Sequence, residues 1–231
     1  MTPRWKPDQP QTVTFSGLLK FRVTFPHAQT YSQENSLVYH LHGSFRSRAF
    51  RVMWALEEMG ETYEHSNTQP RTPEIIALNP NGKIPVLLVD GVPLTDSTAI
   101  LTYLADKHGK LTYPPGTIER ARQDGWTQMV LDELDGTLWT SARHSFGLPE
   151  ELRMPEIKDS LRWEFAQSCK RIATLLEGPF IMGDRMTLPD IVLGHCLGWA
   201  AVAKFPCDEP VLADYSARLR ARPAYRAAQS R

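Results

Sequence analysis

The stretch LNPNGKIPVLLVDGVPLTDSTAI, residues 78–100, constrains the fold more than any other part of the sequence. Pro85 cannot donate a hydrogen bond to a neighbouring strand, so it belongs at the first residue of a strand, at a sheet edge or at a bulge. Asp90-Gly91 between VLLV and VPLT predicts a tight hairpin. Asp96, with the Ser and Thr after it, provides polar side chains that can begin the helical run STAILTYLADKHG. This combination suits the capture of a small anionic peptide.

The residues around this stretch predict a small α/β layer. SLVYHLH predicts a strand, and AFRVMWALEEM predicts a helix that ends at Gly60, a suitable C-terminal cap. ETYEHSN predicts a second strand, and TPEIIALNP a short helix that Pro80 stops. With the hairpin and a helix at 97–108, the order is β-α-β-α-β-β-α in about 75 residues. We therefore expect an α/β domain over residues 37–110.

The second half of the chain predicts helices only. LTYPPGT, residues 111–117, has the composition of a linker, and long amphipathic stretches follow within residues 118–231. Thr187 and Asp190 have the spacing of a capping box ahead of IVLGHCLGWAAVA. That helix is apolar on all sides, so we expect it to be central and buried.

Residues 1–36 differ from the rest. A Pro-rich polar start, without the apolar core and cleavage site of a secretory signal, precedes TVTFSGLLKFRVTF. Its apolar residues alternate with polar ones, which predicts a half-buried strand or hairpin. The alternative is an extension with no structural role.

Composition excludes several classes of function. Lys plus Arg and Asp plus Glu both total 26, and this balance argues against a nucleic-acid-binding surface. No apolar run approaches the roughly 20 residues of a membrane span. The three cysteines have no C-x-x-C spacing and the histidines no metal-binding spacing, so we expect neither disulfides nor a metal. A cytoplasmic protein with ordinary buried thiols is the default expectation.

Four pieces in this order resemble the cytosolic glutathione transferase superfamily: FRSRAFRVMWALEEMGETYE, NPNGKIPVLLVDG, LTDSTAILTYLA, and MTLPDIVLG with the terminal RPAY. The resemblance covers Leu37 to about Tyr225. It implies a thioredoxin-like α/β N-terminal domain followed by an all-α C-terminal domain, with glutathione as co-substrate and a homodimer as the assembly.

The resemblance also implies glutathione contacts. Pro85 would be cis, and the backbone of Ile84 would pair with the cysteinyl unit of glutathione like an added strand. Lys83 would contact the glycyl carboxylate, or be an ordinary solvated lysine. Ser97 would bind the γ-glutamyl carboxylate at a helix N-terminus, and Asp96 the ammonium group. The plainer alternative is that Asp96 and Ser97 only cap a helix.

A serine is the expected activator of the glutathione thiol. Serine-type members place this hydroxyl just after the first strand, where HGSFRSRAF offers Ser44 and Ser47. Ser47 lies nearer the helix start and is favoured, with the alternative that it caps the helix while Ser44 activates. Arg48 could support the thiolate or pair with an acidic neighbour. Tyr39 lies too far upstream for the tyrosine type, and this half contains no cysteine for the cysteine type.

An apolar cleft for the second substrate is expected between residues 43–47 and the first long helix of the C-terminal half. Its candidate residues are aromatic, methionine or histidine side chains: Trp126, Met129, Trp139, His144 and Phe146. The predicted function is conjugation of glutathione to a small hydrophobic electrophile. The alternatives are glutathione-dependent isomerisation or peroxide reduction at the same thiolate, and a non-catalytic binding or regulatory protein on the same fold.

Overall fold

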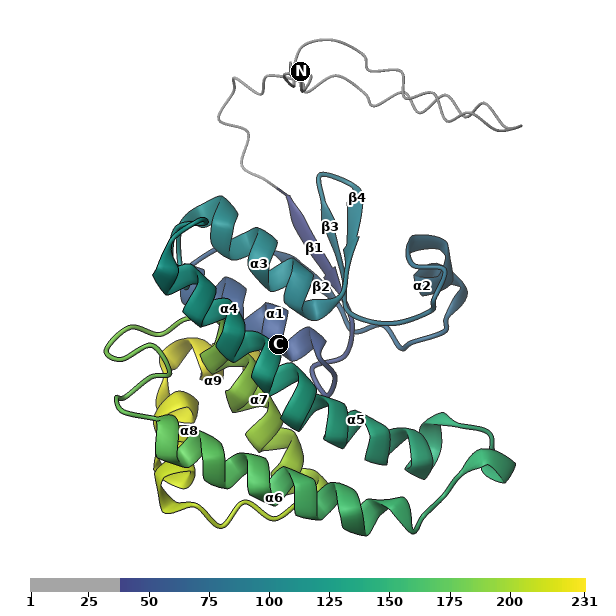
Figure 1. Ribbon diagram of the computed structural model, residues 1–231. Helices are drawn as coiled ribbons and strands as arrows, with labels where there is room; N and C mark the ends of the chain where they lie inside the picture. The colour runs from purple at the N-terminus through teal and green to yellow at the C-terminus, as the bar shows by residue number, and fades with distance from the viewer. Residues whose placement is uncertain (1–37) are drawn as a thin grey trace, which may run out of the picture. The chain divides into compact units, whose positions relative to one another are not determined.

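The computed structural model describes residues 38–231. The strand or hairpin expected within residues 1–36 lies outside the described residues. Four short strands form one sheet in the order β2-β1-β3-β4 (Figure 1): β1 (Tyr39–His42), β2 (Glu64–Ser66), β3 (Val86–Val89) and β4 (Val92–Thr95). β1 runs parallel to β2 and antiparallel to β3, and β4 is antiparallel to β3.

Three helices alternate with these strands in the predicted order: α1 (Ala49–Met59), α2 (Pro73–Leu78) and α3 (Ser97–His108). α1 and α3 lie side by side on one side of the sheet, whereas α2 lies on the other (Figure 1). α1 ends at Gly60 as expected, in the left-handed conformation with φ 74°. The result is the thioredoxin-like layer that the sequence predicts.

The hairpin is also confirmed. β3 begins directly after Pro85, and Asp90 and Gly91 connect it to β4. Both turn residues have positive φ, 49° and 83°, and the flanking Val89 and Val92 are paired. Such a turn matches the twist of the two strands, so the hairpin has a fixed register.

The rest of the described chain is helical. In chain order the elements are α4 (Ile118–Val130), the π-helical turn η1 (Leu131–Asp135), α5 (Gly136–Ala142), the π-helical turn η2 (Arg143–Gly147), the 3-10 turn η3 (Glu150–Leu152), α6 (Ile157–Leu175), α7 (Leu188–Ala203), α8 (Pro210–Ala221) and α9 (Pro223–Gln229). This all-helical half confirms the expected fold class.

α7 is the central helix, as predicted. Thr187 and Asp190 form the expected capping box at its start, and Asp190 is fully buried. A Cβ at Gly194 would lie 2.8 Å from Leu219 and 3.0 Å from the indole of Trp54. The missing side chain of Gly194 therefore allows α7 to pack closely against both α1 and α8. Through this contact with α1, α7 joins the helical half to the α/β layer.

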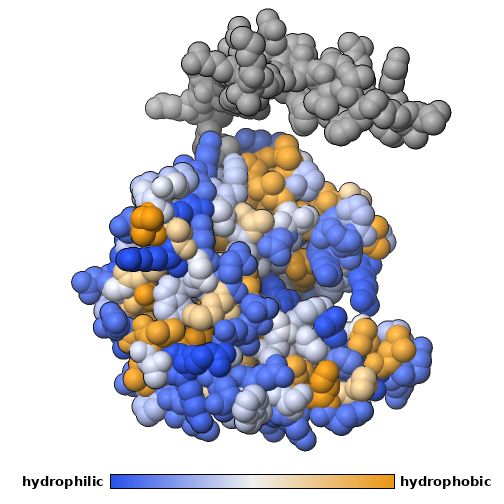
Figure 2. Space-filling model, in the orientation of Figure 1, coloured by the Kyte–Doolittle hydropathy of each residue, from blue (hydrophilic) through white to orange (hydrophobic). Residues whose placement is uncertain are grey.

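Most of the surface in Figure 2 is hydrophilic, with smaller apolar patches. One patch covers the segment that joins α5 to α6, where Phe146, Leu152 and Met154 are exposed. Among residues 38–231, no helix has the length and apolar character needed to cross a membrane. The same residues contain no group of three or more potential metal ligands in binding geometry.

Candidate active site

Three loops meet at one end of the sheet, as the strand register shows. His42, the last residue of β1, is paired with Val86, the first residue of β3. Val86 is in turn paired with Thr95, the last residue of β4. The segment after β1, the segment 84–85 before β3 and the segment 96–97 after β4 are therefore neighbours. The fold thus brings together the serine pair and the two motifs that were singled out in the sequence.

Gly43 allows these loops to approach one another closely. Its φ is 144°, and a Cβ there would lie 2.8 Å from the Cβ of Ala49 and 3.3 Å from the Cβ of Ile84. His65 Nε2 donates to the Gly43 carbonyl at 2.8 Å, and the Gly43 N–H donates to the Ser66 carbonyl at 2.9 Å. The chain leaving β1 is therefore held between β2, α1 and the segment before β3.

The segment before β3 has the geometry expected for peptide capture. The Ile84-Pro85 bond is cis, as the family resemblance implied. Asn79 supports the preceding turn, since its side-chain amide donates to the Lys83 carbonyl at 2.9 Å. Within the described residues, neither backbone group of Ile84 forms a hydrogen bond with another backbone group. These two groups can therefore pair with an extended ligand.

The N-terminus of α3 combines capping with available polar groups. Asp96 Oδ1 accepts from the amides of Thr98 at 2.9 Å and Ala99 at 3.0 Å, so the capping interpretation of Asp96 is correct. Its φ is 69°, and its side chain is exposed. Ser97 is only 3% exposed, and Asp96 does not cap its amide. The helix dipole and the Ser97 amide and hydroxyl together suit a carboxylate.

The two candidate serines differ in their hydrogen bonds. Ser47 Oγ donates to the Ser44 carbonyl at 2.7 Å and accepts from the Ala49 amide at 3.1 Å. The single hydroxyl proton of Ser47 is therefore already used in a hydrogen bond within the turn before α1. Ser44 Oγ accepts from the Arg46 amide at 3.3 Å, which leaves its proton available for another acceptor.

Arg48, the residue before α1, pairs with an acidic neighbour. Its Nε donates to both carboxylate oxygens of Asp135 in η1, each at 3.1 Å. Arg51, which is fully buried, donates from Nη2 to the same carboxylate and lies 3.1 Å from Nδ1 of His195. Burial alone would raise the pKa of Asp135, but the two guanidinium groups lower it to about 2. Burial and the charge of Arg51 lower the pKa of His195, so its imidazole is neutral.

Two indoles flank the same arginine. The Arg48 guanidinium lies 5.2 Å from the ring centre of Trp139 on α5 and 5.2 Å from that of Trp199 on α7. Of the aromatic candidates, Trp139 is therefore the one placed beside the start of α1. The sequence analysis missed both Asp135 and Trp199. An acidic residue among Leu131, Leu134 and Leu138 at helical spacing was the available signal for a buried carboxylate.

The other candidates for the second substrate lie elsewhere. Trp126 and Met129 on α4 are partly buried and pack against the hydrophobic core. His144 Nδ1 accepts from the Met154 amide at 3.0 Å and so closes the loop before α6. Phe146 is 70% exposed in the apolar patch of Figure 2.

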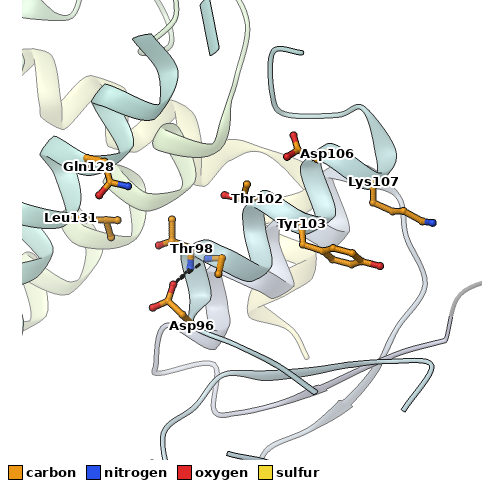
Figure 3. A pocket seen from close by; sticks show the side chains of 9 residues that line it. Asp96, Thr98, Thr102, Tyr103, Asp106, Lys107, Gln128 and Leu131 are labelled. Carbon is orange, nitrogen blue, oxygen red and sulfur yellow. Dashed lines mark hydrogen bonds between the residues drawn. The ribbon is translucent and has the colours of Figure 1, made fainter. Parts of the chain in front are cut away.

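An open hollow of about 860 Å³ begins at the N-terminus of α3. It runs between α3 and the end of α4 (Figure 3). Figure 3 shows Thr98 and Thr102 facing Gln128 and Leu131 across it. Its lining residues are Asp96, Thr98, Ala99, Thr102, Tyr103, Asp106, Lys107, Gln128 and Leu131. Only Asp96 was a sequence candidate, because the others follow ordinary helical patterning.

Comparison with known proteins agrees with this geometry. A sequence model for the N-terminal domain of glutathione S-transferases matches residues 45–107. The chain is 30% identical to glutathione transferase GST 23 of Zea mays, over 66% of this chain and 67% of the maize protein. It is 32% identical to the maleylacetoacetate isomerase of Rhizobium meliloti, over 64% of this chain and 74% of the isomerase.

The chain is also similar to a glutathione S-transferase of known structure. The chain is 28% identical to the theta class glutathione S-transferase of Xanthomonas axonopodis pv. citri, solved with glutathione bound. The two structures superpose with a TM-score of 0.68, over 82% of this chain and 96% of the other. The fold, the convergent loops and these relatives together show that the chain belongs to the cytosolic glutathione S-transferase superfamily.

Proposed function

We propose that this protein binds glutathione at the convergent loops and conjugates its thiol to a small hydrophobic electrophile. The observation that carries the proposal is the strand register, which makes segments 43–47, 84–85 and 96–97 neighbours. In the proposed complex, the backbone of Ile84 pairs with the cysteinyl unit. Ser97 and the α3 N-terminus bind the γ-glutamyl carboxylate, the second carboxylate oxygen of Asp96 accepts from the ammonium group, and Lys83 contacts the glycyl carboxylate.

The thiol is activated by a serine hydroxyl, and the hydrogen bonds favour Ser44 over Ser47. Free glutathione resembles cysteine, whose thiol pKa is about 8.5, so most of it is protonated at neutral pH. A hydroxyl that donates to sulfur near the start of α1 stabilises the thiolate, which is the nucleophile. Ser44 has a proton to donate, whereas the proton of Ser47 is already bonded to the Ser44 carbonyl.

The experiment is a pH profile of conjugation to 1-chloro-2,4-dinitrobenzene for wild type, Ser44→Ala and Ser47→Ala. We expect Ser44→Ala to lower kcat/KM at pH 6.5 by tenfold or more and to move the inflection of the profile toward about 8.5. Ser47→Ala should keep the inflection of wild type. The opposite pattern would assign the role to Ser47, and glutathione binding without turnover would favour a non-catalytic binding protein.

Isomerisation is the second candidate function, because one relative is a maleylacetoacetate isomerase. The same thiolate would add to a cis-dienone and leave again after rotation, so glutathione would not be consumed. Peroxide reduction is a third use of the same thiolate. Quantifying glutathione before and after the reaction separates isomerisation from the other two activities, since conjugation and peroxide reduction both consume it. Analysis of the products then separates conjugation from peroxide reduction.

We also propose that the second substrate lies near Trp139, beside Arg48 and Trp199. The family further supports a homodimer in which the α/β layer of one subunit meets the helical half of the other, and a cytoplasmic location. Light scattering should then give twice the 26.2 kDa of one chain, and fractionation of cells would test the location.

A further inference from the structure

Two arginines share a single carboxylate where the start of α1 meets the helical half. Arg48 and Arg51 both donate to Asp135, and within the described residues no other carboxylate forms an ion pair with either guanidinium. Burial lowers the pKa of the neighbouring His195, so its imidazole adds no charge. The three charged side chains therefore carry one positive charge in excess.

Only Arg48 can present this excess charge to a ligand. The side chain of Arg51 is fully buried, whereas that of Arg48 is 27% exposed. Arg48 uses Nε and Nη2 to bind Asp135, and among residues 38–231 its Nη1 has no hydrogen-bond partner. Arg51 alone would neutralise the carboxylate of Asp135, so a purely structural ion pair does not require the second guanidinium.

Arg48 lies between two aromatic rings and next to the proposed catalytic loop. Its guanidinium carbon is 5.2 Å from the ring centre of Trp139 and 5.2 Å from that of Trp199. All three side chains are half-buried, so each has surface that a ligand can contact. Ser47, the residue before Arg48, belongs to the turn that also contains Ser44. A cation between two indoles suits a ligand with a planar apolar body and an anionic group.

We propose that Arg48 selects electrophiles that carry a carboxylate. This inference rests on the proposed conjugation and names its substrate class. The carboxylate accepts a charge-assisted hydrogen bond from Nη1 of Arg48, and the apolar body of the electrophile packs against Trp139 and Trp199. With an aryl chloride, the thiolate sulfur of glutathione forms a bond to the ring carbon, and chloride leaves with the electron pair of the C–Cl bond. The carboxylate is unchanged by the reaction and serves only for recognition.

The experiment compares 4-chloro-3,5-dinitrobenzoate with its neutral amide, 4-chloro-3,5-dinitrobenzamide. Each kcat/KM is divided by the rate constant of the uncatalysed reaction with glutathione at the same pH, so that the intrinsic reactivities of the two rings cancel. We expect wild type to favour the benzoate by about tenfold or more at low ionic strength. The preference should fall as salt is added, because the partly exposed charge is screened.

Three variants assign the preference to Arg48. Arg48→Gln should remove most of the preference, chiefly by raising KM for the benzoate. Arg48→Lys keeps the charge but not the planar guanidinium, so it should retain an intermediate preference. Arg162→Gln is the matched control, because Arg162 on α6 also pairs with an aspartate and lies 5.9 Å from the ring centre of Phe205. The control should have the preference of wild type.

The comparison in wild type needs no substitution, so it tests the inference whether or not Arg48→Gln folds. Equal normalised kcat/KM values for the two compounds in wild type would overturn the inference and leave the proposed conjugation standing. No turnover of either compound would overturn both. An unchanged preference in Arg48→Gln would show that another cation is responsible. A variant that instead lost activity equally with both compounds and shifted the inflection of the pH profile would place the action of Arg48 on the thiolate, and would also overturn the inference.

Discussion

Replacing Asp135 by asparagine should remove the carboxylate that joins the start of α1 to the helical half. Asp135 is 5% exposed and accepts hydrogen bonds from both Arg48 and Arg51. Within the described residues, Nε and Nη1 of the buried Arg51 have no hydrogen-bond partner, so Asp135 provides most of the compensation for its charge. The variant keeps the shape of the side chain, removes the negative charge and replaces one of the two acceptor oxygens by an NH2 donor.

The free energy of unfolding should fall by about 2–4 kcal/mol at pH 7. A pKa lowered from 3.8 to about 2 corresponds to about 2 kcal/mol of favourable interaction with the charged form. The upper part of the range reflects Arg51, because a buried guanidinium without its carboxylate is costly. As the folded-state pKa is lowered, this contribution is fully present above pH 4 and is lost as the pH falls from about 4 toward 2.

Urea unfolding of wild type and Asp135→Asn between pH 7 and pH 3 measures both effects. The difference in unfolding free energy should be constant at neutral pH and should shrink below pH 4. Asp159→Asn is the matched control, since Asp159 pairs on the surface with Arg162 and its side chain is 89% exposed. It should cost at most about 0.5 kcal/mol. Equal effects of the two substitutions, or a difference that does not change with pH, would refute the reasoning.

Further predictions concern single contacts. Asp190→Ala should lower stability by about 3 kcal/mol or more, measured by thermal unfolding, because the carboxylate accepts from the Tyr215 hydroxyl at 2.7 Å and from buried amides. Gly43→Ala should weaken glutathione binding in calorimetry, because the new methyl group would lie 2.8 Å from the Cβ of Ala49 and displace the loop. Lys83→Ala should weaken binding of glutathione several-fold but leave binding of its glycyl ethyl ester unchanged, since the ester lacks that carboxylate.

Much of the fold could be predicted because its signals are local. Pro85, the Asp90-Gly91 turn and the capping box at Thr187–Asp190 each act within a few residues, and the structure confirms all three. The α7 prediction was also correct, because a helix that is apolar on all sides has to be buried. The boundaries at residues 110 and 118 stay a prediction.

The contacts around the site could not be predicted in the same way. Asp135 meets Arg51 and Arg48 across 84 and 87 residues of chain, and no local pattern encodes such a pairing. The preference for Ser44 over Ser47 depends on which of the two hydroxyls already donates its proton to a backbone carbonyl of the turn before α1. The spacing of the residues in the sequence does not reveal that. Spacing to the helix favoured Ser47, and the role of either serine stays a prediction.

The measurement that tests the central claim most directly is a calorimetric titration of glutathione into wild type, Ser97→Ala and Ser160→Ala. Ser160 is an exposed serine on α6, whose hydroxyl bonds only locally to the Ile157 carbonyl. We expect micromolar to millimolar binding by wild type, the same affinity for Ser160→Ala, and an affinity lower by about tenfold or more for Ser97→Ala. Absence of binding to wild type, or equal affinity of all three proteins, would contradict a glutathione site at the N-terminus of α3.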